Sequence, residues 1–145
     1  MFEIADFYRY CKTHNVDVIP YDGCPKEGAT IRDAGFYAVF LDFTKIKSTR
    51  LLRGVCYHEL GHVATGALHK VDSPYELAER SEYRANRWAA ETFLTEQAFR
   101  EAFSAGFTEL WQLEEYFDLP EADIRAALNY WTLSRGIDFS KQETK

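Results

Sequence analysis

The sequence has few cysteines, and their spacing does not suit a disulfide framework. Its 145 residues include three, Cys11, Cys24 and Cys56, and no two of them form a C-x-x-C pair. An odd number of thiols fits a reducing compartment, so a cytoplasmic protein is expected. We expect Cys56 to pack in the core, and Cys24, which lies in a stretch with glycine and proline, to be an exposed thiol.

Long apolar runs are also lacking. No stretch approaches the roughly 18 consecutive apolar residues of a transmembrane helix. The first six residues, MFEIAD, have neither the basic segment nor the apolar run of a secretory signal peptide. The sequence therefore predicts neither a membrane partner nor export.

Basic residues are too few for a nucleic-acid-binding surface. Lys and Arg number 17 against 23 Asp and Glu, which gives a net charge of −6. Neutralising phosphates requires a surplus of positive charge on one face. Direct contact with nucleic acid is therefore not expected.

Apolar residues, in contrast, are plentiful, at 46% hydrophobic and 16% aromatic. The length suits one domain over residues 1–145, and the pattern predicts a mainly helical α+β fold with a small three-stranded sheet. This sheet is expected to pack near the helix at 49–67. The expected strands are 15–20, 29–33 and 36–43. The expected helices are 2–13, 49–67, 74–94 with Ser73 as its cap, 95–104, 108–117 and 120–133.

Residues 58–62 carry the main chemical signal, because His58-Glu59-Leu60-Gly61-His62 is an H-E-x-x-H motif. Residues i and i+4 stand one turn apart on the same face of a helix, so both imidazoles can bind one Zn²⁺. The glutamate after the first histidine then lies beside a metal-bound water, from which it can take a proton. We therefore predict His58 and His62 as zinc ligands and Glu59 as the general base.

Helix periodicity places the two histidines away from the main apolar stripe. That stripe consists of Leu52, Cys56, Leu60, Val63 and Ala67. His58 and His62 share a second, partly apolar face with Leu51, Val55 and Thr65, and another element must cover that face. Two histidines also leave one protein ligand missing.

Six residues could supply the third ligand. They are His69, Asp72, Glu76, Glu79, Glu82 and Glu91. Glu82 lies in the middle of the apolar stripe of the helix that follows Pro74, where a carboxylate is costly to bury without a partner. A metal would be such a partner, and a Lys or Arg across the helices would be another. Glu82 is the expected ligand, with Glu79 and His69 as alternatives.

These segments resemble the ImmA/IrrE family of small zinc-dependent metallopeptidases. Besides residues 58–62, the resemblance rests on Glu82–Glu91, which is similar to the family's E-x-x-A-N-x-F-A-A block with Trp88 in place of Phe. The order of helix, small sheet, metal-binding helix and glutamate helix is also similar. The resemblance covers residues 1–95 well and the rest of the chain loosely.

The resemblance implies a zincin-like domain that hydrolyses peptide bonds as an endopeptidase. In this family His58, His62 and Glu82 would bind one zinc ion per chain, and Glu59 would be the general base. Members encoded on phages and mobile elements cleave or inactivate a helix-turn-helix repressor, which implies such a partner here. The alternative is a zinc-stabilised binding module that sequesters or senses a repressor without cutting it.

Four further residues are expected near the cleft. Asn86 follows the third ligand by one turn, and it could hydrogen-bond a ligand or make an ordinary helix–helix contact. His69 comes one residue too late for a metzincin motif but could line the site mouth. Tyr37 and Tyr75 are expected beside the cleft. The strand at 36–43 is expected to hold an extended peptide by edge pairing.

Residues 96–133 are expected to form acidic helices, followed by a loose tail at 134–145. Within 104–134, six carboxylates stand against the single Arg125, a net charge of −5. A helix-turn-helix pattern is present, but this charge would repel phosphate. We expect helices that close the domain, or a surface for a basic protein partner. The aromatic residues expected to be exposed there are Trp111, Tyr116, Tyr130 and Trp131.

Overall fold

The described residues form an α+β fold with six α-helices and one small sheet, and the α+β fold was predicted. The computed structural model describes residues 1–33, 35–66 and 75–141, apart from the side chains of residues 33 and 75–77. The elements are α1 (Ile4–Thr13), β1 (Val16–Pro20), β2 (Gly28–Asp33), β3 (Phe36–Leu41), α2 (Thr49–Thr65), α3 (Tyr75–Phe93), α4 (Glu96–Ser104), α5 (Leu110–Phe117), α6 (Glu121–Asn129) and a π-helical turn η1 (Tyr130–Ser134).

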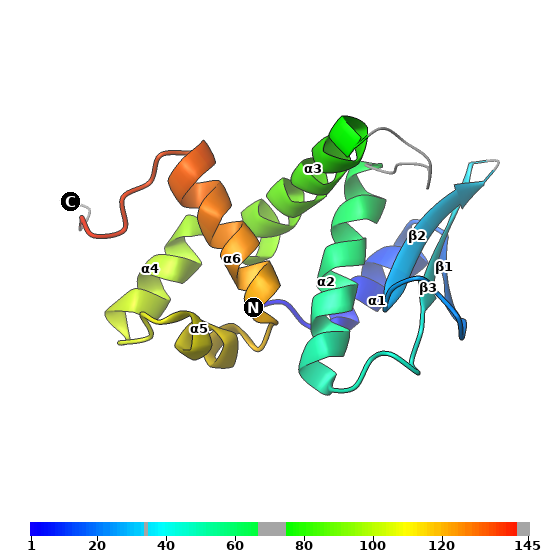
Figure 1. Cartoon of the computed structure of the whole chain (residues 1–145), viewed down its shortest axis with the longest axis horizontal. Helices are drawn as coiled ribbons and strands as arrows, with labels where there is room; N and C mark the ends of the chain where they lie inside the picture. The colour runs from blue at the N-terminus through cyan, green and yellow to red at the C-terminus, as the bar shows by residue number, and fades with distance from the viewer. Residues whose placement is uncertain (34, 67–74, 142–145) are drawn as a thin grey trace.

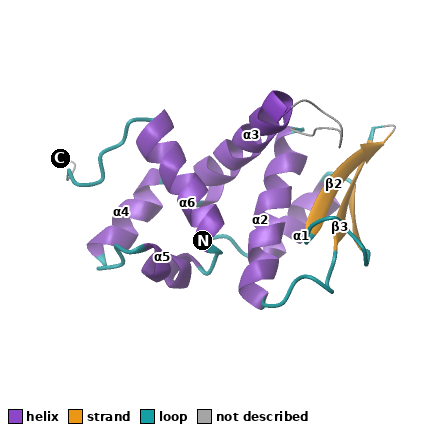
Figure 2. Ribbon diagram, in the orientation of Figure 1, coloured by secondary structure: helices purple, strands orange, loops and turns teal. Residues whose placement is uncertain are grey.

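Helix α2 runs through the middle of the molecule. The sheet and α1 lie on one side of it, and α3 to α6 lie on the other (Figure 1). Figure 2 shows that the strands are confined to one end of the structure. None of the described helices is both long and apolar enough to cross a membrane.

The sheet has the order β1-β3-β2. β3 pairs in parallel with β1 and antiparallel with β2, so its backbone groups are occupied on both sides. The expectation that the strand at 36–43 offers an edge to a peptide is therefore wrong. The strand that pairs on one side only, within the described residues, and also packs against α2 is β2.

One hydrophobic core connects both halves of the structure. It includes Val39 of β3, Leu60 of α2, Phe99 of α4 and Ile124 of α6, each of which is almost fully buried. The predicted core stripe of α2 is confirmed for the described residues. Its members Cys56, Leu60 and Val63 are buried and Leu52 is partly buried.

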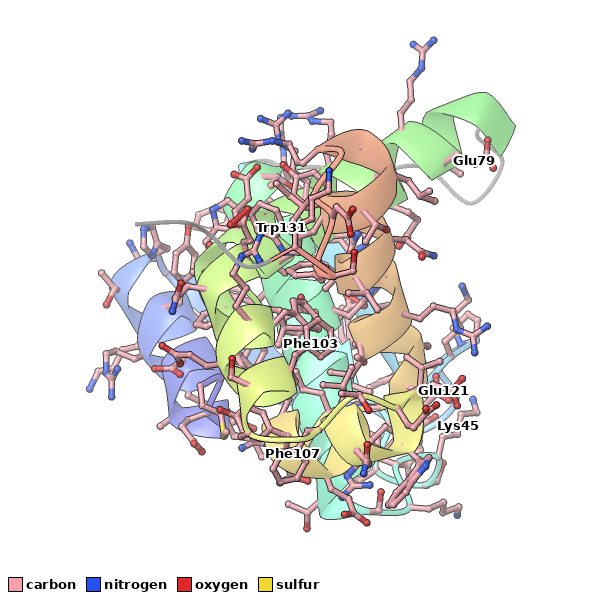
Figure 3. The ribbon with its side chains drawn as sticks, turned by 90° about the vertical axis from the view of Figure 1, so that its left-hand side faces the viewer. Lys45, Glu79, Phe103, Phe107, Glu121 and Trp131 are labelled. Atoms are coloured by element: carbon pink, nitrogen blue, oxygen red, sulfur yellow. The ribbon has the colours of Figure 1, made fainter. Side chains whose placement is uncertain are left out.

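Two aromatic residues of the C-terminal region are buried where exposure was expected. Tyr130 is 3% and Trp131 8% exposed, whereas Trp111 is 60% exposed. The Trp131 indole donates a hydrogen bond to the Leu94 carbonyl at 2.7 Å, which satisfies its polar group inside the fold. Figure 3 shows Trp131 among the helices of this half.

A buried carboxylate organises the loops that lead into α2. Asp42 accepts hydrogen bonds from the backbone N–H groups of Gly23 (3.0 Å), Cys24 (3.1 Å) and Thr44 (3.0 Å). These bonds fold the 21–24 turn back onto the end of β3. Cys24 is consequently 4% exposed, so the expectation of an exposed thiol is wrong.

Candidate metal centre

Helix α2 presents both histidines of the motif from a helix with defined ends. The Ser48 hydroxyl accepts a hydrogen bond from the Leu51 N–H at 3.0 Å, and Gly66 ends the helix in the left-handed conformation (φ +64°). His58 and His62 lie one turn apart, and their Nε2 atoms are 3.2 Å apart. Both rings therefore point to the same position.

Helix α3 brings Glu82 to that position. Its Oε2 lies 3.2 Å from His58 Nε2, and its Oε1 lies 3.2 Å from His62 Nε2. The two helices approach closely because Gly61 faces α3: a Cβ at this position would lie 2.5 Å from the Ala85 carbonyl oxygen. The glycine inside the motif thus allows the α3 carboxylate to reach the histidines.

The three side chains fit a divalent metal ion. Ligand atoms about 2.0 Å from a tetrahedral zinc ion lie about 3.3 Å from one another. The two histidine Nε2 atoms are 3.2 Å apart, and each lies 3.2 Å from a different oxygen of Glu82. Two imidazoles and one carboxylate are also the donor set of many catalytic zinc sites. Within the described residues, His58, His62 and Glu82 form one possible metal-binding group.

The charges of the cluster are strongly coupled. Burial by itself would lower the pKa of His58, but the hydrogen bond with Glu82 and the charges of Glu59 and Glu82 outweigh it and raise this pKa to about 9. Burial would raise the pKa of Glu82, but its hydrogen bonds to His58 and His62 hold that pKa well below its ordinary value. The carboxylate is therefore ionised and ready to bind a cation.

Glu59 lies on α2 between the histidines but on the side of the sheet. It is 6% exposed, and its Oε2 accepts a hydrogen bond from the Thr30 hydroxyl of β2 at 2.8 Å. Gly28 allows β2 to approach α2 closely, because a Cβ there would lie 2.6 Å from Val55 Cγ1. Thr30 was not predicted from the sequence. Helical and strand periodicity relate residues within one element, so neither could show that a residue of β2 contacts a residue of α2.

The other residues expected near the cleft have different positions. Asn86 Nδ2 donates to the Ala126 carbonyl at 3.1 Å, which is the helix–helix contact considered from the sequence. The Tyr37 hydroxyl lies against the C-terminal end of α2, 3.4 Å from where a Gly66 Cβ would be. His69 and the side chain of Tyr75 lie outside the described residues.

Of the alternative third ligands, Glu79 and Glu91 lie in the described part of the chain and are not part of the cluster. Glu79 is exposed near the outer end of α3 (Figure 3). Glu91 pairs with Arg87 at 3.0 Å and accepts a hydrogen bond from the Tyr130 hydroxyl. Asp72 and the side chain of Glu76 lie outside the described residues.

A cavity of about 360 Å³ borders the metal centre on the side of α6. It is lined by His58, Glu82, and two polar residues that sequence reasoning missed, Tyr57 and Asp123. Burial raises the pKa of Asp123 to about 6, and the charge of His58 opposes this increase only in part. Asp123 was counted from the sequence only as one acidic residue among six, because its approach to α2 depends on the tertiary packing of α6.

Comparison with known proteins gives one match. The family model Peptidase_M78, described as the IrrE N-terminal-like domain, matches residues 26–129, which include α2, α3 and the whole candidate site. Neither the search of curated proteins nor the search of solved structures found a match. A model that covers this much of the chain shows the family: the chain belongs to the IrrE N-terminal-like family of peptidases.

Proposed function

We propose that this chain is a zinc-dependent endopeptidase with His58, His62 and Glu82 as ligands and Glu59 as general base. The observation that carries the proposal is the 3.2 Å convergence of two imidazoles and one carboxylate beside a buried glutamate. When bound, zinc supplies the Lewis acidity that activates water and polarises a scissile carbonyl. The peptidase family of the chain supports this chemistry.

Glu59 has the environment of a positioned base. The Thr30 hydroxyl donates to its Oε2, which fixes the carboxylate and leaves Oε1 to take a proton from the attacking water. The same carboxylate can then return the proton to the leaving amine. Because Thr30 belongs to β2, a peptide that adds to the free edge of this strand would lie next to the base.

The base is tested by Glu59→Gln, which keeps the shape of the side chain but removes its proton acceptor. We expect peptide hydrolysis to fall about 10²–10⁴-fold, while native mass spectrometry finds the same zinc content as in the wild type. Glu79→Gln, a change at an exposed carboxylate of α3, is the matched control. Full activity in the Glu59 variant would refute the assigned mechanism.

The ligand set is tested by Glu82→Ala. The loss of one of three protein ligands should sharply reduce bound zinc, whereas Glu79→Ala should leave it unchanged. Unchanged zinc in the Glu82 variant would contradict the proposed set. Such a result would direct attention to the segment around His69.

The proposed substrate is a basic DNA-binding protein, namely a helix-turn-helix repressor. The support is the acidic surface of α5 and α6, where Glu114, Glu115 and Glu121 accompany Arg125 as the one basic side chain. The test incubates the zinc-loaded chain with helix-turn-helix proteins encoded beside its gene. Cleavage that Glu59→Gln abolishes supports the proposal, and stable binding without cleavage supports the non-catalytic alternative.

A further inference from the structure

The cavity beside the metal centre contains two polar side chains, Tyr57 and Asp123, that form no side-chain hydrogen bond within the described residues. It lies between α2, α3 and α6 and has a volume of about 360 Å³. Its volume lies at the lower end of the roughly 300 to 1,000 Å³ of ligand pockets, and the cavity can hold a single substrate side chain. Because His58 and Glu82 form part of its wall, a group in the cavity would lie next to the proposed zinc site.

Tyr57 is the first of these groups. Its side chain is 2% exposed, and its hydroxyl has no hydrogen-bond partner, the one such buried side-chain atom among the described residues. A buried hydroxyl without a hydrogen-bond partner destabilises the fold. Because Tyr57 lines the cavity, a polar group bound there could hydrogen-bond its hydroxyl and remove this penalty.

Asp123 is the second group. A Cβ on Gly54 would lie 2.8 Å from its Oδ2, so the carboxylate rests against the face of α2 that also carries Tyr57 and His58. It forms no ion pair with a lysine or arginine in the described part of the chain. A carboxylate in this position can accept a hydrogen bond from a cation that enters the cavity.

The rest of the wall is mostly apolar, with four small residues beside Tyr83 and Asn86. The small residues are Ala85, Ala89, Ala122 and Ala126. A largely apolar wall next to a carboxylate and a hydroxyl matches an aliphatic stem with a cationic end. We propose that the cavity is a subsite for a lysine-like side chain of the substrate, with Asp123 and Tyr57 as the residues that recognise its charge.

An alternative explanation of Asp123 is a purely structural one, because acidic residues stabilise the first turn of a helix. Glu121 occupies the same first turn of α6, but it is exposed and pairs with Arg125. The two carboxylates therefore have different surroundings although they share one helix end. Glu121→Gln removes the same charge from that end and is the matched control.

The first test does not depend on hydrolysis or on zinc. The full chain, with and without zinc, is titrated with n-butylammonium and with the isosteric neutral 1-butanol, and the NMR signals of Tyr57 and residues 122–126 are followed. The amine should bind at least about tenfold more tightly than the alcohol, because a hydrogen bond to a charged partner is worth about 1.5–3 kcal/mol. Asp123→Asn should remove this preference, Tyr57→Phe should reduce it, and Glu121→Gln should leave it intact.

Equal binding of the amine and the alcohol by the wild type would overturn the proposal, and this comparison requires no variant to fold. A preference that survives in Asp123→Asn would also overturn it. Thermal unfolding of each variant shows whether the fold is retained.

The second test rests on the proposed peptidase function. A mixed peptide library is digested with the zinc-loaded chain, and the cleavage sites are read by mass spectrometry. We expect lysine or arginine to be enriched at one position beside the cut, and Asp123→Lys to replace this enrichment by aspartate or glutamate. Amine binding without any cleavage would refute the peptidase function alone, whereas cleavage without a basic preference would refute the subsite.

Discussion

At the scale of single residues, Arg53 is the side chain that ties distant parts of the chain to α2. It is 6% exposed, its Nε donates to the Asp118 carbonyl at 2.8 Å, and its guanidinium pairs with Glu3 at 3.0 Å. It also donates to the carbonyls of Phe2 and Phe117. One arginine thus holds the chain start and the α5–α6 link against the helix that carries the histidines.

Arg53→Met should therefore destabilise the fold without touching the site. The variant leaves several buried carbonyls without donors, and we expect a loss of about 2–4 kcal/mol in the free energy of unfolding. Arg50→Met is the control, since its more exposed pair with Asp118 should contribute at most about 1 kcal/mol. Urea denaturation measures both, and equal losses would contradict the assigned role.

Asp42 makes the stability of the fold decrease as the pH falls into the acidic range. The hydrogen bond from the Thr44 hydroxyl above all, with that from the Gly23 N–H, outweighs burial and holds the pKa of Asp42 well below its ordinary 3.8. The unfolded chain therefore takes up a proton at Asp42 before the folded chain does. The contribution of Asp42 to the free energy of unfolding is fully present at pH values above its ordinary pKa and is lost as the pH falls below that value.

Asp42→Asn should remove this part of the acid sensitivity. The variant is expected to be less stable than the wild type at neutral pH, because a neutral amide accepts the loop hydrogen bonds more weakly. Its urea midpoint should fall less than that of the wild type between about pH 5 and about pH 3. Parallel curves for the two proteins would show that Asp42 is not responsible.

Residue spacing predicted the convergence of the candidate ligands, although their role as ligands stays a prediction. The i, i+4 step placed His58 and His62 together, and the cost of a carboxylate on an apolar stripe singled out Glu82. Thr30 and Asp123 could not be found in this way. Their contacts join elements far apart in the sequence, and no periodicity records which elements become neighbours.

At the scale of elements, α2 and α3 approach each other closely at Gly61. Gly61 leaves α2 in direct contact with the Ala85 backbone of α3. A glycine inside a helix costs roughly 1 kcal/mol relative to alanine. This cost is offset here by a spacing that lets Glu82 reach both histidines.

Gly61→Ala should therefore lower stability even though alanine is the better helix former. The added methyl group must displace the α3 backbone, and we expect a net loss of about 1–3 kcal/mol and weaker zinc binding. Thermal unfolding and zinc competition with a chelator provide the measurements. Gly106→Ala, at a position open to solvent but with φ +93°, is a control that should affect stability alone.

Element types were predictable from periodicity, whereas their ends and pairing were less so. The strand expected to reach residue 43 ends at Leu41, because Asp42 turns its carboxylate into the loop network. The last helix leaves α-geometry after Asn129, where a π turn buries Tyr130 and Trp131. The sequence did not indicate the order of the strands. A parallel pair requires a crossover connection, and the residue pattern of a single strand does not show which strand it will pair with.

At the scale of the whole molecule, the acidic helices contribute to the same core as the metal-binding helices. Leu94 lies at the end of the predicted catalytic core, and it packs in one cluster with Phe99, Phe117 and Ile124. The family match at residues 26–129 also runs across the predicted boundary between a catalytic core at 1–95 and closing helices at 96–133. The single domain itself stays a prediction.

A fragment of residues 1–95 should not fold on its own. It would expose the apolar faces of α2 and α3 that α4 to α6 cover, and it would lose the Trp131 bond to Leu94. Circular dichroism of this fragment should show little cooperative unfolding, in contrast to a single transition for the full chain. A cooperative transition in the fragment would establish an independent catalytic core.

The position of α2 between the two halves has a mechanical consequence. The histidines face α3, while Glu59 on the same helix faces β2, so two of the three proposed ligands and the proposed base belong to one helix with a rise of about 1.5 Å per residue. A shift of the sheet against the helical half would therefore move β2 relative to α3. The distance from the histidine pair to the proposed base would not change, because both lie on α2.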